Sequence, residues 1–329
     1  MTWLITGGAG YIGSHVVKSM TEAGERVAVL DDLSHGDPAR LPAGVALEVG
    51  TVLDRAFVDR VLREHAVEGI VHLAAKKAVG ESVERPLLYY RENLSGLQVL
   101  LDAAAGAGVS SFLFSSSASV YGTPDTDLVT EDTPCAPLSP YGETKVAGEW
   151  MVRAVGRAHG MATGCLRYFN VAGTAAPELA DTGVANLVPM VFERLDAGRP
   201  PLIFGDDYPT PDGTCVRDYI HVADLADAHL TAARRLAERA AKDDFRDLTL
   251  NIGRGEGVSV REMIDLVREV TGRDVTPEVV ARRPGDPAQV VASAERISTE
   301  LGWTARHDVR SMIASAWAAH TARSVQPAE

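Results

Sequence analysis

Apolar runs alternate with helical patterns through the first half of the chain. Short apolar runs, each typical of a buried strand, lie at 2–6, 26–30, 45–49, 69–73, 110–114 and 162–168. Apolar residues at helical spacing predict helices at about 11–23, 54–64, 82–107 (broken near Pro86) and 141–159. Strands and helices that alternate in this way predict an α/β fold built on a doubly wound parallel sheet, with ligands at the carboxyl ends of the strands.

The pattern changes after residue 170. Residues 171–216 are rich in Gly, Pro, Asn and Asp, and only a short stretch at 187–197 has helical spacing. The remainder predicts helices at 222–238 and 258–270, a strand at 248–252 and an extended segment at 274–292. We therefore expect a first domain of residues 1–170 and a smaller mixed α/β lobe of residues 171–329, with some later segments returning to the first domain.

Composition and charge narrow the class of protein. Hydrophobic residues make up 46% of the chain and charged residues 23%, as in ordinary globular enzymes. The net charge of −13 argues against general binding to nucleic acid or to anionic membranes. No run of about 20 apolar residues predicts a membrane span. The 3 cysteines lack the spacing of a zinc site or a disulfide framework, so we expect a cytoplasmic protein and no metal.

A glycine-rich turn follows the first apolar run. Gly7, Gly10 and Gly13 have the spacing Gly-x-x-Gly-x-x-Gly, and Asp31 ends the next predicted strand. In a Rossmann-type sheet such glycines allow a tight turn, close approach of the backbone to a pyrophosphate and close helix packing. A carboxylate at Asp31 would hydrogen-bond the adenosine ribose and repel a 2′-phosphate, so NAD is expected rather than NADP.

Tyr141 and Lys145 are four residues apart in the predicted helix that begins after Pro140, so their side chains share one face. A phenol titrates near ~10 and is a poor base at neutral pH. A fixed ammonium one turn away, together with a cofactor charge, would favour the phenolate. Lowering the phenol pKa to about 7 corresponds to about 4 kcal/mol of differential interaction. Because Tyr-x-x-x-Lys recurs by chance in many helices, the pair needs other motifs beside it.

Such motifs are present along nearly the whole chain. They lie at 76–82, 115–122, 139–145, 167–170, 207–222 and 283–286, in addition to the glycine turn at 7–13. With these motifs the sequence resembles the UDP-glucose 4-epimerases of the extended short-chain dehydrogenase/reductase family. The block at 208–222 is more specific than the glycine turn, because it distinguishes these epimerases from their many relatives.

The resemblance implies that tightly bound NAD reversibly oxidises C4 of the sugar through a 4-keto intermediate and so interconverts UDP-glucose and UDP-galactose. It implies that Tyr141 removes the O4 proton, that Lys145 holds the nicotinamide ribose and lowers the pKa of the tyrosine, and that Ser117 hydrogen-bonds the substrate oxygen. The implied NAD contacts are Gly7, Gly10, Tyr11, Ile12, Gly13, Asp31, Asp32, Leu33, Ser34, His35, Gly36, Thr51, Val52, Leu73, Ala74, Ala75, Lys77, Asn93, Ser115, Tyr141, Lys145 and Tyr168.

The implied contacts of the UDP-sugar are Lys77, Ser117, Tyr141, Phe169, Asn170, Asn186, Leu187, Leu202, Ile203, Phe204, Arg217, Arg283, Asp286 and Val290. Among these, Arg217 and Arg283 match a diphosphate clamp, and arginine suits bidentate phosphate contacts. Ile203 and Phe204 match the uridine site, and Asp286 the uridine ribose.

Several of these positions have a structural alternative. Asn186 is also a good helix cap, Phe204 a good core residue, and Ser117 could simply satisfy a strand end. A lone arginine is usually a solvated surface charge. His72 lies inside an apolar run and is expected to be a core histidine rather than a ligand.

The sequence departs from the family at two positions. Thr51 stands where the family usually has an aspartate that accepts the adenine amino group, which predicts looser retention of NAD because a hydroxyl accepts more weakly than a carboxylate. Val290 aligns with the position that gates the 2-substituent of the sugar, where some relatives carry tyrosine. The smaller valine leaves space for an N-acetyl group.

Alternatives to a UDP-glucose 4-epimerase remain open. They are an epimerase of UDP-glucuronate/UDP-galacturonate or of UDP-N-acetylhexosamine, a nucleotide-sugar dehydratase, and a non-catalytic NAD-sensing protein. Dehydratases need an acid beside the catalytic serine, and the motif here is Ser116-Ser117-Ala118. The resemblance also implies a homodimer that pairs the helices at 86–107 and 141–159, although the sequence shows no obvious large apolar stripe on their exposed faces.

Overall fold

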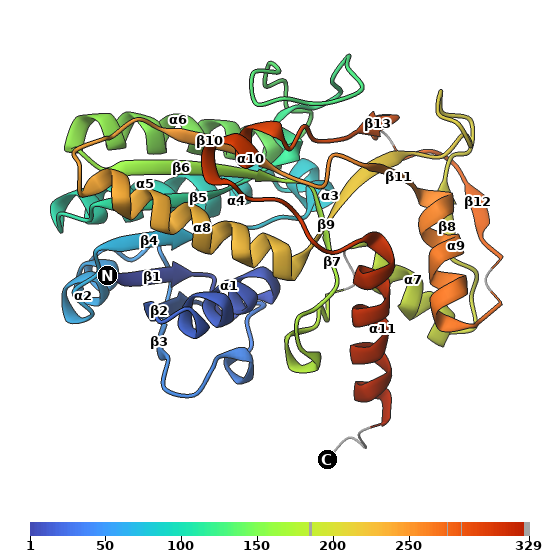
Figure 1. Ribbon diagram of the computed structural model, residues 1–329, viewed down its shortest axis with the longest axis horizontal. Helices are drawn as coiled ribbons and strands as arrows, with labels where there is room; N and C mark the ends of the chain where they lie inside the picture. Colours follow the sequence, from blue (N-terminus) through green and yellow to red (C-terminus); the bar gives the residue numbers. More distant parts are fainter. Residues whose placement is uncertain (184–185, 275, 284, 326–329) are drawn as a thin grey trace.

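A seven-stranded parallel sheet forms the larger part of this computed structural model, which describes residues 1–183, 186–274, 276–283 and 285–325 (Figure 1). The strand order is β10-β6-β5-β4-β1-β2-β3. The strands are β1 (Thr2–Thr6), β2 (Arg26–Asp31), β3 (Ala46–Val49), β4 (Gly69–His72), β5 (Ser111–Ser117), β6 (Ala162–Tyr168) and β10 (Leu248–Ile252). The chain winds outward in one direction from β1 and in the other from β4, so the predicted doubly wound sheet is confirmed, with its switch point between β1 and β4.

Helices cover both faces of this sheet because alternate strand residues point to opposite sides. Trp3 and Ile5 of β1 pack in a cluster with α1 (Tyr11–Glu22) and α8 (Val222–Ala240). Leu4, between them, packs on the other face with α2 (Arg55–Glu64), α5 (Gly96–Gly106) and α6 (Pro140–His159). Both clusters consist of buried hydrophobic residues. They hold the helices on the sheet and so keep the carboxyl ends of the strands in place.

A smaller part of the molecule packs beside the carboxyl ends of the large sheet (Figure 1). Its strands are β7 (Asn170–Ala172), β8 (Leu202–Phe204), β9 (Val216–His221), β11 (Gly257–Ser259), β12 (Glu278–Val280) and β13 (Gln289–Val290). Strand β9 pairs with β7, β11 and β13, and β12 pairs with β8. The helices are α7 (Leu187–Asp196), α9 (Val260–Thr271), α10 (Glu295–Leu301) and α11 (Val309–Val325). Phe192, Ile264 and Met312 join α7, α9 and α11 in one apolar cluster.

The predicted break near Pro86 is confirmed, whereas other elements differ from the prediction. The predicted helix at 82–107 is divided into α3 (Val79–Glu84), α4 (Pro86–Tyr89), the π-helical segment η2 (Tyr90–Ser95) and α5. The break falls at Arg85, with φ −131° and ψ 56°, because the residue before a proline avoids helical angles. Strand β5 continues to Ser117, three residues beyond its predicted end.

Elements later in the chain cross between the two parts. Strand β10 and helix α8 follow residue 170 yet belong to the large sheet and its covering layer. These elements cross the predicted boundary, so a division into two domains at residue 170 stays a prediction. The remaining short 3-10 helices are η1 (Pro38–Arg40), η3 (Ala118–Val120) and η4 (Pro177–Leu179). Within the described ranges, none of the helices is long and apolar enough to cross a membrane.

Candidate active site

The glycine turn between β1 and α1 is built as a nucleotide cradle. Gly7 has φ +72°, and a Cβ there would lie 2.8 Å from the backbone nitrogen of Ala74. A Cβ on Gly13 would lie 2.0 Å from the Gly7 carbonyl oxygen, so both positions need glycine. Gly10 is the N-cap of α1 and makes no side-chain cap, which leaves N–H groups of the first helical turn available to a phosphate.

Asp31 ends β2 beside this turn and is held as a buried acceptor. Its carboxylate accepts the backbone N–H groups of Ala9 and Leu33, each at 2.9 Å. The side chain is buried, and a Cβ on Gly36 would lie 2.7 Å from Asp31 Oδ1. A carboxylate has about four lone-pair positions, so two remain for ribose hydroxyls. The cradle and this fixed acid together fit NAD.

Asn93, expected to contact NAD, has its side chain occupied by protein groups. Its Oδ1 accepts the N–H of Lys76 at 2.8 Å, and its Nδ2 donates to the Lys76 carbonyl and to Thr144 Oγ1, both at 3.0 Å. Asn93 lies in the π-helical η2, a rare conformation that recurs at functional sites. The side chain therefore ties the loop after β4, which carries Lys77, to helix α6.

Tyr141 and Lys145 are placed by the start of α6 against the end of β5. Ser139 caps the helix by accepting the N–H of Gly142 at 3.2 Å, and Pro140 occupies its first turn. Lys145 Nζ donates to the Ser115 carbonyl at 2.8 Å and lies 5.7 Å from the centroid of the Tyr141 ring. The lysine charge is thus fixed between the strand end and the phenol.

Ser117 is the last residue of β5 and faces the same site. Its Oγ accepts the N–H of Ser119 at 3.1 Å and donates to Ser119 Oγ at 3.2 Å. The Tyr141 phenol lies within hydrogen-bonding reach of the same hydroxyl. The structural role weighed from the sequence is therefore real, since Ser117 caps η3, and it coexists with a position beside Tyr141.

Burial shifts the pKa values of both Tyr141 and Lys145. Burial raises the pKa of Tyr141, and its hydrogen bond with Ser117 only partly opposes that. Burial also lowers the pKa of Lys145 to about 7, against the charge of Glu149 one turn further along α6. The lowering of the Tyr141 pKa that is expected from Lys145 together with a cofactor charge stays a prediction for the protein with bound NAD. A second positive charge at this site would favour the phenolate.

A pocket of about 320 Å³ lies in the smaller part of the molecule, lined by residues of β7, α7, β8 and β9 together with Arg283 and Asp286. The sequence-predicted residues that line it are Asn170, Asn186, Leu187, Leu202, Ile203, Phe204, Arg217, Arg283 and Asp286. Arg217 lies 3.7 Å from Asp286, and the Arg283 guanidinium covers the Phe204 ring at 3.7 Å from its centroid. Two arginines beside an aromatic wall suit an anionic nucleotide. Asn186 occupies the N-cap position of α7, but its side chain donates to Asp181 instead of capping the helix.

Val290 and Phe169 are placed near the catalytic residues rather than in that pocket. Both are buried in a cluster that includes Val146 of α6 and packs against Ala118, the residue after Ser117. Val290 also pairs with Arg217 across β13 and β9. Val146 of α6, Val290 of β13 and Phe169 after β6 thus form an apolar wall near Ser117. His72 is buried, and its Nδ1 lies 2.7 Å from Thr6 Oγ1, as expected of a core histidine.

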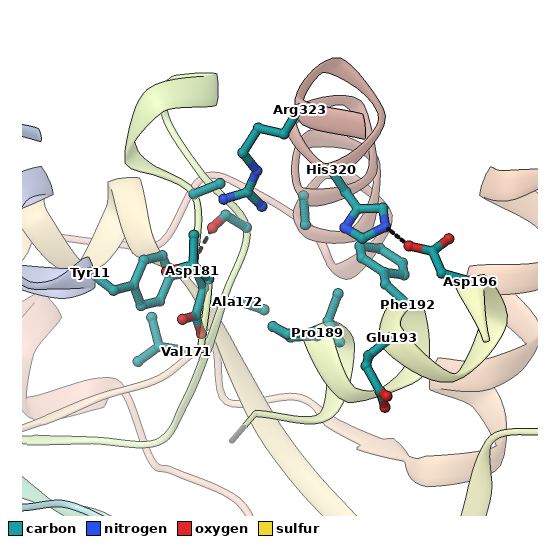
Figure 2. Close-up of a pocket in the computed structure, with 15 residues that line it drawn as sticks. Tyr11, Val171, Ala172, Asp181, Pro189, Phe192, Glu193, Asp196, His320 and Arg323 are labelled. Atoms are coloured by element: carbon teal, nitrogen blue, oxygen red, sulfur yellow. Dashed lines mark hydrogen bonds and ion pairs between the residues drawn. The ribbon is translucent and has the colours of Figure 1, made fainter. Parts of the chain in front are cut away.

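A second pocket, of about 470 Å³, was not foreseen from the sequence (Figure 2). Its wall combines Tyr11, whose hydroxyl donates to the Gly173 carbonyl at 2.6 Å, with residues of β7, α7 and α11. An ion pair of His320 with Asp196, at 2.6 Å, and the side chain of Arg323 lie on the helical side. These residues come from four distant segments, so no local motif could have indicated them.

A Rossmann-type sheet with a glycine cradle, a buried acid at the end of β2 and a Ser-Tyr-Lys set defines an enzyme of the short-chain dehydrogenase/reductase type. Residues 3–253 match the model of the NAD dependent epimerase/dehydratase family. The chain belongs to this family.

Relatives and solved structures agree with that placement. A UDP-glucose 4-epimerase of Azospirillum brasilense is 46% identical over 311 residues, which cover 93% of this chain and 87% of the relative. A UDP-glucose 4-epimerase structure from Stenotrophomonas maltophila, with bound NAD and formylated UDP-arabinopyranose, has a TM-score of 0.92 and 38% identity and covers 98% of this chain and 99% of that one. One from Bifidobacterium longum, in complex with NAD+ and UDP, has a TM-score of 0.91 and 36% identity over 98% of this chain and 99% of that one.

Proposed function

We propose that the chain is an NAD-dependent 4-epimerase that interconverts UDP-glucose and UDP-galactose. The observation that carries the proposal is that Tyr141 and Lys145 of α6 lie against the end of β5 that carries Ser117, in a chain that also has a glycine cradle and a pocket lined by Arg217 and Arg283. Relatives with 46% and 43% identity over nearly the whole chain are UDP-glucose 4-epimerases, which supports the same reaction here. The chain is accordingly an isomerase whose cofactor is NAD.

The side chains divide the chemistry among them. Bound NAD supplies the acceptor and donor of the hydride at sugar C4. Tyr141, as the phenolate, takes the proton of the O4 hydroxyl and returns it after the sugar has turned over. Lys145 keeps a positive charge beside the phenol, and Ser117 hydrogen-bonds the substrate oxygen while it is a hydroxyl and while it is a ketone. The 4-keto sugar is uncharged, so the site needs no additional ion to stabilise it.

Inversion at C4 requires a firm hold on the nucleotide and a loose hold on the sugar. Arg217 and Arg283 bind the diphosphate, and Phe204 and Ile203 line the uridine site. The sugar side of the site is bounded by Val290, Phe169 and Ala118, which offer dispersion contacts and few hydrogen bonds. A ring held mainly through its diphosphate can present either face to the cofactor.

The short side chain at Val290 extends the substrate range to UDP-N-acetylhexosamines. Val290 is buried in the apolar cluster around Phe169, so its size sets how far that wall reaches. Tyrosine at this position would add a ring and a hydroxyl to the wall, whereas valine leaves that volume to a 2-N-acetyl group. This assignment distinguishes the sugars by size and leaves the C4 chemistry unchanged.

The direct test is an NMR assay of the purified protein with UDP-galactose, UDP-glucuronate and UDP-N-acetylglucosamine in separate reactions, with and without added NAD. The proposal predicts new anomeric signals of UDP-glucose from UDP-galactose and slower conversion of UDP-N-acetylglucosamine. Conversion of UDP-glucuronate alone would keep the mechanism and replace the sugar. No conversion of any of the three, with NAD bound, would contradict the proposed function.

We also propose that the protein is a homodimer located in the cytoplasm. Helices α3, α4 and α6 pack together and expose Val83, Leu87 and Trp150, which are 62%, 80% and 64% exposed. Val83, Leu87 and Trp150 lie on three different helices, so they form no single large apolar stripe, as the sequence indicates. Sedimentation velocity should give a dimer for the native chain and a monomer for Trp150→Glu; a native monomer would contradict the proposal. The three free thiols, Cys135, Cys165 and Cys215, suit a reducing compartment.

A further inference from the structure

Glu149 is a buried carboxylate two helical turns after Tyr141 and one turn after Lys145. Both oxygens bind Arg167 of β6, with Arg167 Nε 2.7 Å from Oε1 and Arg167 Nη2 2.6 Å from Oε2. Arg153 donates to Oε2 from the solvent side, at 2.6 Å. A bidentate guanidinium and a second arginine can keep a buried carboxylate ionised. Burial alone would raise the pKa of Glu149, but Arg167, Ser116 and Arg153 together outweigh that effect and the pKa is lowered.

A serine hydroxyl also donates a hydrogen bond to the Glu149 carboxylate. Ser116 donates its hydroxyl to Glu149 Oε1 at 2.6 Å, and both side chains are buried. Lys145 donates to the carbonyl of Ser115 at 2.8 Å. Two residues one turn apart on α6 thus hold two consecutive residues of β5, and the next residue of that strand is Ser117. The distance between Ser117 on the strand and Tyr141 on the helix is therefore set by these two contacts.

Arg167 extends the same network to the surrounding elements. Its Nη1 donates to the Tyr121 hydroxyl at 2.9 Å and to the Glu131 carbonyl at 3.1 Å. The Tyr121 hydroxyl in turn donates to Asn251 Oδ1 at 2.6 Å. Helix α6, strands β5, β6 and β10 and the segment after β5 consequently share one set of buried hydrogen bonds, with Glu149 at the point where α6 joins it.

From these contacts we propose that Glu149 is a positioning residue for the reaction. Through Ser116 it fixes Ser117 against Tyr141, and as the carboxylate one turn from Lys145 it keeps that lysine charged. The inference deepens the proposed epimerase function and rests on it for its kinetic part. The carboxylate is buried and forms its hydrogen bonds with Ser116, Arg153 and Arg167, so its effect passes through Ser117 and Lys145.

The other titratable groups around Lys145 do not supply the compensating charge. Tyr141 shares its helix, His72 faces it from β4, and Tyr168 of β6 hydrogen-bonds the hydroxyl of Ser115. Burial lowers the pKa of His72 to about 3 and raises the pKa of both tyrosines, so these three groups are neutral at pH 7 before NAD adds its charge. Glu149 is the anion of the set, and it opposes the effect of burial on the Lys145 pKa.

Two variants separate the two effects. Ser116→Ala removes the contact with β5 and keeps every charge; it should lower kcat about tenfold, leave KM within about twofold and leave the pH profile unchanged. Glu149→Gln keeps an acceptor oxygen for Ser116 and removes the charge. It should move the alkaline limb of kcat, where Lys145 loses its proton, about one pH unit lower. A role in folding alone would shift neither the profile nor kcat per folded molecule.

The proton on Lys145 can be followed without turnover. Carbon-13 labelling of lysine side chains gives signals from Lys145 and from Lys18, Lys76, Lys77 and Lys242, and the Lys145 signal is the one absent from Lys145→Met. In Glu149→Gln its titration midpoint should fall by about one unit. Arg153→Gln is the matched control: it removes a charged partner of Glu149 from the same helix and should not lower the midpoint, even though it destabilises the fold.

The outcomes distinguish the inference from the function on which it rests. If the native protein epimerises and Ser116→Ala has native kcat, the positioning of Ser117 by Glu149 is wrong. If the lysine midpoint is the same in Glu149→Gln as in the native chain, the electrostatic part is wrong. A native protein without epimerase activity would overturn the proposed function, while the lysine titration would still decide the contact between Glu149 and Lys145. Should Glu149→Gln fail to fold because Arg167 is left unpaired, Ser116→Ala still decides the positioning.

Discussion

Lys145 follows Tyr141 by one turn of α6, and its ammonium nitrogen lies 5.7 Å from the centroid of the phenol ring. The same nitrogen donates to the Ser115 carbonyl at 2.8 Å, so the ammonium is held by the strand rather than by the tyrosine. Burial raises the pKa of the phenol and lowers that of the lysine. The phenolate of Tyr141 and the ammonium of Lys145 therefore stabilise each other, and the charge of bound NAD contributes to the same ionised state.

Replacement of the lysine tests this dependence. Lys145→Met keeps the length and apolar stem of the side chain but removes its charge. We expect kcat for UDP-galactose to fall about 100-fold or more at pH 7. The acidic limb of kcat should move to higher pH, because the Tyr141 pKa rises without the ammonium. Steady-state kinetics between pH 6 and 10 measure both effects, and an unmoved acidic limb would show that the lysine only binds the cofactor.

Thr51 is expected to weaken the retention of NAD. Its Oγ1 accepts the N–H of Leu53 at 3.2 Å, so a lone pair that could face the adenine amino group is already engaged. Thr51→Asp has a second oxygen for adenine and should tighten NAD about 10-fold to 100-fold, which corresponds to the roughly 1.5–3 kcal/mol of one charge-assisted hydrogen bond. The measurement is the ratio of NAD to protein after gel filtration, with Thr51→Ser as the matched control. Full NAD occupancy of the native chain after the column would contradict this account.

Val290 should control the size of the accepted sugar. In Val290→Tyr the ring extends from the Phe169 cluster toward the sugar, and turnover of UDP-N-acetylglucosamine should fall about 100-fold while that of UDP-galactose stays within about threefold. Val290→Ala is the control, since it cannot obstruct the N-acetyl group. The two substrates are compared by kcat/KM. Equal losses on both would mean that the tyrosine disturbs the fold, and no native turnover of the N-acetyl sugar would remove the basis for the assignment.

Buried histidines make the fold sensitive to acid. Burial lowers the pKa of His15, His221 and His229 to about 4, below the ordinary value of 6.5. The unfolded chain binds these protons below about pH 6.5 and the folded chain does not until about pH 4. Stability is therefore complete above pH 6.5 and falls as the pH drops, by about 1 kcal/mol for each histidine at pH 5.5.

His229 provides the test, because its Nε2 has no hydrogen-bond partner among the described residues. Its Nδ1 donates to the Leu225 carbonyl at 2.8 Å within α8. Between pH 7.5 and pH 5.5 the free energy of unfolding should fall by about 1 kcal/mol less in His229→Leu than in the native chain. Urea unfolding at the two pH values, with saturating NAD, gives the difference. An identical pH dependence in both proteins would show that His229 is protonated in the folded state.

The large sheet and the core of the site are accessible from sequence because their signals are local. The apolar run at 162–168 has the same bounds as β6, and the Ser139 cap and Pro140 fix where α6 begins. The glycine turn and the Tyr141–Lys145 pair each lie within one short segment, so their spacing already carries their geometry.

Other features depend on contacts between distant segments. Strand β9 was not predicted from the sequence. Its partners β7, β11 and β13 have only two or three residues each, which is too short to show the alternation of apolar and polar residues that indicates a sheet. Helix α11 is rich in alanine and serine, although Val309, Met312 and Ile313 have the spacing of a buried face and could have indicated it. The Arg167–Glu149 pair joins a strand to a helix, and neither sequence position identifies the other.

The central claim is that C4 is oxidised and reduced within one active site, with Tyr141 moving the proton. It is tested by UDP-galactose carrying deuterium at C4, converted in ordinary water and analysed by mass spectrometry and NMR beside Tyr141→Phe. The account predicts UDP-glucose that retains the deuterium at C4, and a loss of at least about 100-fold in the variant, which still binds UDP and NAD. Loss of the deuterium to water, or native turnover by Tyr141→Phe, would contradict it.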